Sequence, residues 1–106
     1  MIIYPRYWFS AGFTPLPNLM IIRKDCQHSV PLHKHEETHQ EQMRRDGVLK
    51  FWFRYLFSKK HRLNYEVEAY KVQISHGASL DGCAKNLSIM YYLGISFETA
   101  KNLLSD

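Results

Sequence analysis

The sequence has few of the residues that cross-link a chain or anchor it in a membrane. Only two of its 106 residues are cysteines, Cys26 and Cys83, so at most one disulfide can form and a disulfide scaffold is excluded. The longest apolar stretch, residues 48–57, is interrupted by Lys50 and Arg54 and is far shorter than the roughly 20 residues of a membrane-spanning helix. The N-terminus lacks the charged start and uninterrupted apolar run of a secretory signal. We therefore expect a reducing, cytoplasmic setting with two ordinary thiols.

Repeats, low-complexity segments and linkers are also missing, so the sequence predicts one domain spanning residues 1–106. Hydrophobic residues make up 45% of the chain and charged residues 23%, which is typical of a folded protein with its own core.

Acidic residues are scarce in one segment. Residues 44–62 contain seven lysines and arginines and a single acid, Asp46, whereas the whole chain carries a net charge of only +4. A positive segment of this kind can meet nucleic acid, an anionic membrane surface or an acidic protein, but it is more often a solvated helix face. We do not expect nucleic-acid binding, and a membrane surface is an alternative that the sequence does not favour. The oligomeric state is left open.

Hydrophobic periodicity predicts short extended pieces up to residue 30, among them a strand at residues 19–22, followed by about five helices. The expected helices cover residues 32–46, 48–58, 65–76, 79–93 and 97–104. Asn64 is the expected N-cap of the third helix, after a loop at residues 59–63, and Ser96 that of the fifth. Few strands followed by many helices indicate an α+β fold that is mostly α, with a short N-terminal β-hairpin or small sheet.

The second of these helices is apolar almost all the way round. The favoured interpretation is a core helix that bridges the others. The alternative is an exposed apolar face that meets a partner subunit or a membrane surface beside the basic segment.

Residues 35–39 read His-Glu-Glu-Thr-His, an instance of H-E-x-x-H. On a helix, His35 and His39 lie one turn apart on the same face, so both imidazoles can reach one metal ion. Glu36 lies beside them and can act as a general base. At 100° per residue, Leu32 and Met43 share this face, which predicts that the motif points inward.

A catalytic zinc site needs a third protein ligand, and the third helix offers Glu66 and Glu68. The two carboxylates lie 200° apart on the helix and cannot both point at one ion. Glu68 shares the polar face with Lys71 and is expected to pair with it. Glu66 lies on the apolar face beside Ala69, where a lone carboxylate is costly unless it is paired or metal-bound. We therefore predict Glu66 as the third ligand.

These motifs resemble the gluzincin clan of zinc metallopeptidases, in particular its small single-domain members from bacteria and phages. The likeness rests on residues 35–39 together with Glu66-Val67-Glu68-Ala69-Tyr70, and covers roughly residues 18–77. It implies a zincin-like core, a bound Zn²⁺, a peptide or protein substrate, and a bacterial cytoplasm, with a phage gene as an alternative origin. Tyr70 stands where the clan has an aspartate that orients a metal-bound histidine.

The resemblance further implies peptide-bond hydrolysis with Glu36 as general base and a tyrosine or histidine at the oxyanion. The candidates for the oxyanion role are Tyr70, Tyr65, His61 and His76, with Tyr70 placed in the catalytic set. The strand at residues 19–23 is the expected edge for an extended substrate.

A different class of function competes with this one. A catalytically silent zinc-binding protein would act through its basic surface on a protein or nucleic-acid partner. The intact Glu36 favours the enzyme, because a structural metal site has no use for a general base. The tyrosine at position 70 and the small size of the chain favour the alternative.

Overall fold

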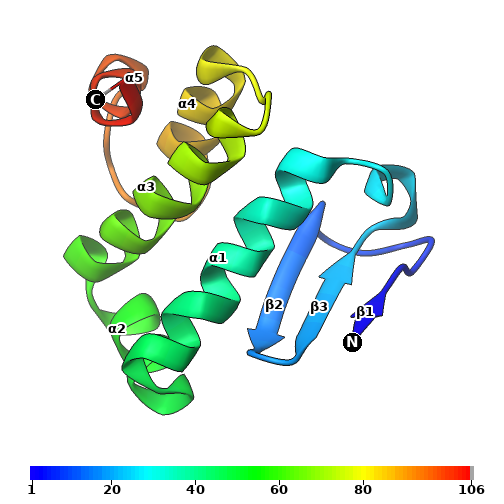
Figure 1. The fold of residues 1–106 in the computed structure, drawn as a ribbon. Helices are drawn as coiled ribbons and strands as arrows, with labels where there is room; N and C mark the ends of the chain where they lie inside the picture. Colours follow the sequence, from blue (N-terminus) through cyan, green and yellow to red (C-terminus); the bar gives the residue numbers. More distant parts are fainter. Residues whose placement is uncertain (106) are drawn as a thin grey trace.

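A small sheet and five α-helices make up the protein, as seen in a computed structural model that describes residues 1–105 (Figure 1). This is the expected α+β architecture, mostly α. The strands are β1 (Ile2–Ile3), β2 (Gly12–Leu16) and β3 (Leu19–Ile22). A short 3₁₀ helix, η1 (Lys24–Cys26), precedes the α-helices, which are α1 (Val30–Asp46), α2 (Val48–Phe57), α3 (Lys59–Ser75), α4 (Leu80–Ile89) and α5 (Phe97–Ser105). No helix within residues 1–105 has the length and apolar character to cross a membrane.

The sheet has the strand order β1-β3-β2, with β3 parallel to β1 and antiparallel to β2. Both sides of β3 are therefore paired, and β2 is an edge strand. The sequence-based expectation that residues 19–23 form the free edge is wrong, because Gly12 pairs with Ile22 and Ile2 pairs with Met20 on opposite sides of that strand.

Helix α1 lies between the sheet and α3 and contacts both β2 and α3 (Figure 1). Its start is set by Ser29, whose hydroxyl accepts a hydrogen bond from the backbone N–H of Leu32. Its end is set by Gly47, whose φ of 89° lies in the left-handed region that favours glycine. The predicted stop at Gly47 is therefore confirmed.

Helix α3 begins six residues earlier than the sequence suggested, at Lys59 and not after Asn64. Ser58 is the actual N-cap: its backbone is extended and its side chain accepts from the N–H of His61. Residues 59–63 contain no glycine or proline that would stop a helix, so the better cap upstream decides the boundary.

Helix α4 ends at Ile89 and does not continue to residue 93 as expected. Tyr91 and Tyr92 have φ values of 70° and 52°, which no helix accommodates. The Arg62 side chain donates hydrogen bonds to the carbonyl oxygens of both tyrosines and so holds this turn against α3. Ser96 caps α5 as predicted, through the N–H of Thr99.

Two apolar clusters hold the helices together. One lies where α3, α4 and α5 meet and includes Leu87, Ala100 and Leu104; the other joins Met43, Phe51 and Tyr65. Phe51 is the one buried side chain of α2. The prediction of a core helix bridging the others is thus wrong for most of α2, because its 10 residues contact α1 and α3 along a single face.

Candidate metal centre

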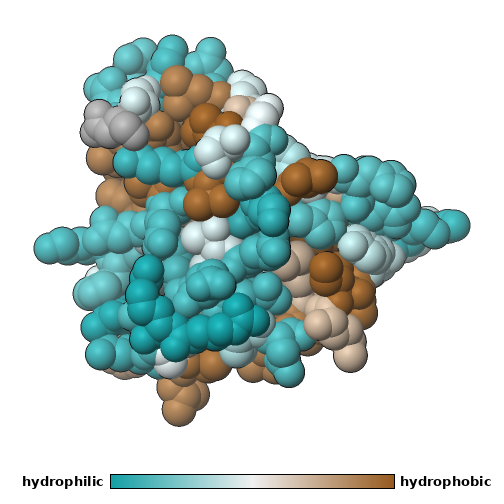
Figure 2. Space-filling model, in the orientation of Figure 1, coloured by the Kyte–Doolittle hydropathy of each residue, from teal (hydrophilic) through white to brown (hydrophobic). Residues whose placement is uncertain are grey.

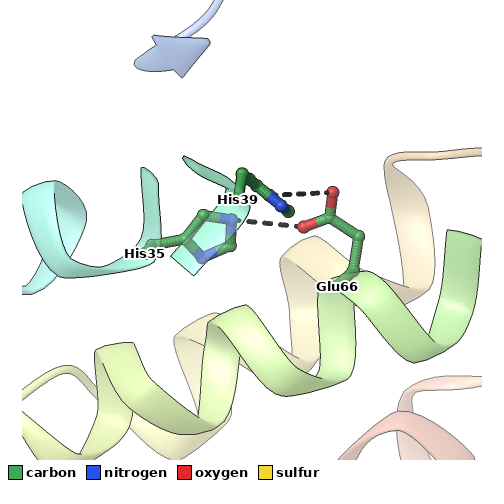
Figure 3. Close-up of side chains that lie close together, drawn as sticks. All are labelled: His35, His39 and Glu66. Carbon is green, nitrogen blue, oxygen red and sulfur yellow. Dashed lines mark ion pairs between the residues drawn. The ribbon is translucent and has the colours of Figure 1, made fainter. Parts of the chain in front are cut away.

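Two helices bring three metal-ligating side chains together inside the protein. His35 and His39 project from α1, and Glu66 projects toward them from α3 (Figure 3). His35 Nε2 lies 3.2 Å from Glu66 Oε1, and His39 Nε2 lies 3.3 Å from Oε2. One ligand atom from each residue falls within 4.8 Å of the others, and all three side chains are buried. The structure therefore brings together the three residues that the sequence predicted as metal ligands.

The choice between Glu66 and Glu68 follows from the side of α3 on which each one lies. Glu66 is 1% exposed and faces α1. Glu68 is half-exposed and accepts hydrogen bonds from Gln42 and Arg45. The expected ion pair between Glu68 and Lys71 is wrong, because Glu68 pairs with Arg45 of α1.

The charges of this group depend on one another. Burial by itself lowers the pKa of His39. The charge and hydrogen-bonding capacity of the Glu66 carboxylate, together with the charge of the nearby Glu36, outweigh burial and raise the pKa of His39 to about 9. Burial raises the pKa of Glu66, but His39 and His35 outweigh it and hold the pKa well below the ordinary value. An ionised carboxylate between two imidazoles is thus the favoured state.

A divalent cation fits these donors. Glu66 Oε1 is buried and accepts no hydrogen bond within the described chain, since the 3.2 Å contact with His35 lacks hydrogen-bond geometry. An unsatisfied buried carboxylate oxygen is costly, and a cation would satisfy it. Two imidazole nitrogens and one carboxylate oxygen form a ligand set typical of catalytic zinc.

The proton on His39 gives the metal-free protein a pH dependence that zinc should reverse. Because the folded-state pKa of about 9 is above the unfolded value near 6.5, His39 contributes stability that is complete below pH 6.5 and is lost as pH rises through 9. We expect the Tm of chelator-treated protein to fall by about 5 °C or more over this range.

Zinc binds the neutral imidazole, so the increase in Tm on adding zinc should grow over the same range. Thermal denaturation with and without zinc measures both trends, and His33→Gln, away from the cluster, should leave them unchanged. A metal-free Tm that is flat or rises with pH would contradict this electrostatic account.

Glu36 is held beside the three ligands by strand β2. Thr14 donates a hydrogen bond of 2.8 Å from Oγ1 to Glu36 Oε1. Gly12 lies close to the other oxygen, because a Cβ atom at this position would come within 2.9 Å of Oε2. The sequence predicted the location of Glu36, but neither Thr14 nor Gly12, which precede it by more than 20 residues.

A pocket of about 770 Å³ opens onto these residues. Its lining includes His35, His39, Glu66 and Glu36, and the rest of the lining is largely aromatic and aliphatic. The aromatic lining comes from β2 and the preceding segment, from α2, from α3 and from the turn after α4. It consists of Phe9, Phe13, Phe51, Trp52, Tyr55, Tyr70, Tyr91 and Tyr92. The small chain therefore does contain a cleft large enough for a side chain and its flanking peptide groups.

Comparisons with known proteins add no relative. No protein family, curated protein or solved structure matches the chain. The resemblance to gluzincins stays an expectation based on short motifs.

Tyr70 lies in the pocket, but it does not hold a histidine as an aspartate would. Its ring packs edge-on against His35 at 4.4 Å between centroids, and its hydroxyl is hydrogen-bonded to that of Tyr91 at 2.6 Å. His35 Nδ1 is left without a hydrogen-bond partner among the described residues. Of the other oxyanion candidates, Tyr65 donates to Asp46, His61 bonds to Ser58 and His76 bonds to the Val72 carbonyl, and none of the three lines the pocket.

Two residues that support the ligands were missed by sequence reasoning. Gln42 is fully buried and accepts from His39 Nδ1 at 2.8 Å, while its amide group donates to the Tyr65 carbonyl and to Glu68. Tyr55 of α2 donates a 2.5 Å hydrogen bond to Glu66 Oε2. A glutamine one turn after His39 on the inward face was a usable signal for Gln42. Tyr55 gave none, because its contact depends on how α2 folds back on α3.

Proposed function

We propose that the protein is a zinc-dependent peptidase in which Glu36 is the general base. The observation that carries this proposal is the placement of Glu36: a buried carboxylate, oriented by Thr14, that lines the same pocket as His35, His39 and Glu66. A metal site that serves only storage or stability has no use for a second carboxylate, Glu36, held beside the ligand Glu66. This favours the enzyme over a catalytically silent zinc-binding protein.

His35, His39 and Glu66 would hold the zinc ion. When bound, such an ion lowers the pKa of a water in its open position and polarises the scissile carbonyl group. Glu36 would accept a proton from the attacking water and return it to the leaving amine. Gln42 and Tyr55 would keep His39 and Glu66 in place through the hydrogen bonds described above.

Tyr70 is proposed as the side chain at the oxyanion. Burial is the main reason that its pKa is raised well above the ordinary value, so the phenol stays protonated and can donate a hydrogen bond. Its present partner is the Tyr91 hydroxyl, which can accept from Tyr70 or donate to it. A substrate oxyanion would compete for the same proton, and Tyr91 would then keep Tyr70 oriented.

An extended peptide would pair with β2, not with β3 as expected from the sequence. β2 is the edge strand beside α1, and residues 10–14 line the pocket. Edge strands offer unpaired backbone groups to a peptide. We further propose that the sheet with α1 and α3 forms a zincin-like core, and that the protein works in a bacterial cytoplasm, where the thiols of Cys26 and Cys83 stay reduced.

A peptide library tests the proposed reaction. Zinc-loaded protein incubated with a broad library should produce defined cleavage products by mass spectrometry, and these products should disappear with a chelator and return when zinc is added. Products that persist unchanged in a chelator would show that the activity does not depend on metal and would contradict the proposal.

Gly12→Ala tests whether the position of Glu36 matters for the reaction. The new Cβ would displace the Glu36 carboxylate, which is the flexible end of a side chain, so we expect a stability loss of only about 1–3 kcal/mol. Peptidase activity should fall by roughly ten-fold or more with bound zinc unchanged, because a general base needs hydrogen-bond reach of its proton. Gly82→Ala is the matched control, since its Cβ meets Ser79 only at ordinary contact distance, and it should keep full activity. Full activity in Gly12→Ala would show that the reaction does not depend on the position of Glu36.

A further inference from the structure

Helix α2 leaves an apolar stripe uncovered. Four of its side chains are largely exposed: Leu49 is 88% exposed, Phe53 66%, Leu56 60% and Phe57 76%. Their spacing of i, i+4, i+7 and i+8 places them along one side of the helix. In the space-filling view, brown apolar side chains project at the lower edge, where α2 lies in Figure 1 (Figure 2). We call these four residues the α2 stripe.

The α2 stripe faces away from the pocket. At 100° per residue its centre lies roughly 140° round the helix from that of Phe51, Trp52 and Tyr55, the α2 residues that line the pocket. An occupant of the stripe would therefore leave the entrance to the candidate metal centre free.

Uncompensated positive charge borders the α2 stripe. No acidic residue occurs between Gly47 and Tyr65, and no carboxylate in the described chain lies within ion-pair distance of Lys50, Lys59 or Lys60. Lys59 and Lys60 stand in the first turn of α3, which has no acid and where the helix dipole is also positive. The other cations of the segment are engaged: Arg54 pairs with Asp46, and Arg62 binds backbone carbonyls.

The exposed apolar side chains and the unpaired lysines together indicate which kind of partner fits the α2 stripe. A second copy would bring two sets of like charges together, and the four side chains offer an area on the order of a few hundred Å², below the about 800 Å² that each partner of a stable complex contributes. An anionic lipid surface satisfies both features, since phenylalanine and leucine enter the acyl boundary while lysines meet the headgroups.

We propose that α2 is a membrane-surface docking element, with the α2 stripe inserted into the interface and Lys50, Lys59 and Lys60 at anionic phospholipid headgroups. This site is separate from the candidate metal centre and does not depend on the proposed peptidase activity.

Vesicle co-sedimentation of the full chain tests the proposal. The protein should bind phosphatidylcholine vesicles containing about one third phosphatidylglycerol at least ten-fold more tightly than pure phosphatidylcholine vesicles, and about 0.5 M NaCl should weaken the binding strongly. The double variant Phe53→Ser/Phe57→Ser should lose ten-fold or more in affinity, and Lys59→Gln/Lys60→Gln about five-fold per lysine. Both variants change exposed side chains, so an unchanged circular dichroism spectrum and Tm would show that the fold is kept.

Val30→Ser and Lys85→Gln are the matched controls, because they change an exposed apolar and an exposed basic residue away from α2 and should bind vesicles like wild type. Equal binding by Phe53→Ser/Phe57→Ser and wild type would overturn the proposal, as would the absence of binding to the anionic vesicles. A wild-type dimer in analytical ultracentrifugation that Phe53→Ser/Phe57→Ser converts to a monomer would assign the stripe to a second copy instead.

Discussion

Glu36→Gln is expected to abolish peptidase activity while the protein keeps its fold and its bound zinc. Glu36 lies outside the cluster formed by His35, His39 and Glu66, and Thr14 can still donate to the amide oxygen of glutamine. An amide cannot accept the proton of the attacking water, and loss of a general base typically lowers the rate by about 10²–10⁴-fold. Cleavage rates and zinc content measured on the same preparation separate the two effects.

The controls for this prediction come from neighbouring positions. Glu37→Gln makes the same chemical change one residue further along α1, at an exposed side chain that pairs with Lys34, and should retain activity. His35→Ala should lose zinc and activity together, since it removes a metal ligand. If Glu36→Gln cleaves as fast as wild type, the mechanism proposed for Glu36 is wrong.

Removal of metal is expected to lower the Tm by roughly 15 °C or more, given free zinc at about a thousand-fold over its Kd. The reason lies in α1, whose buried face is mostly polar: the buried residues are His35, Glu36, Thr38, His39, Gln42 and Met43. Met43 is the one apolar side chain among them, so apolar burial alone holds α1 weakly against α3 and the sheet. Zinc would join α1 to α3 through its ligands and couple metal binding to folding.

Differential scanning calorimetry with a chelator and with zinc measures this shift. Glu66→Ala supplies the comparison, because its Tm should not respond to zinc. An equal Tm for metal-free and zinc-loaded wild type would show that metal binding and folding are not coupled. If zinc raised the Tm of Glu66→Ala as much as that of wild type, the stabilising ion would bind elsewhere.

Local periodicity was enough to predict the centre of the site. His35 and His39 are one turn apart, and a carboxylate among apolar neighbours singled out Glu66, so each inference needed only the geometry of one helix. That α1 and α3 would pack with these faces together followed from burial. The sheet beside α1 was expected only as a short hairpin or small sheet, because strand order depends on pairings between distant residues such as Ile2 and Met20.

The rest of the site depends on contacts that no local pattern encodes. Thr14 lies 22 positions before Glu36 in the chain. Tyr55 reaches Glu66 because Ser58 caps α3 directly after α2, so that the two helices pack against each other. Had Asn64 been the cap, a loop would have separated the two helices. The apolar face of α2 was assigned to the core from composition, although a short helix at the edge of a small domain can contact its neighbours along one face only.

Zinc content of the wild type and of two matched α3 variants tests whether His35, His39 and Glu66 form a metal site. After dialysis against buffered zinc, wild-type protein should hold one zinc ion per chain by elemental analysis, and Glu66→Ala should hold almost none. Glu68→Ala removes a half-exposed carboxylate from the same helix and should keep the full complement. Wild-type protein without zinc, or zinc that Glu68→Ala loses and Glu66→Ala retains, would contradict a metal site at His35, His39 and Glu66.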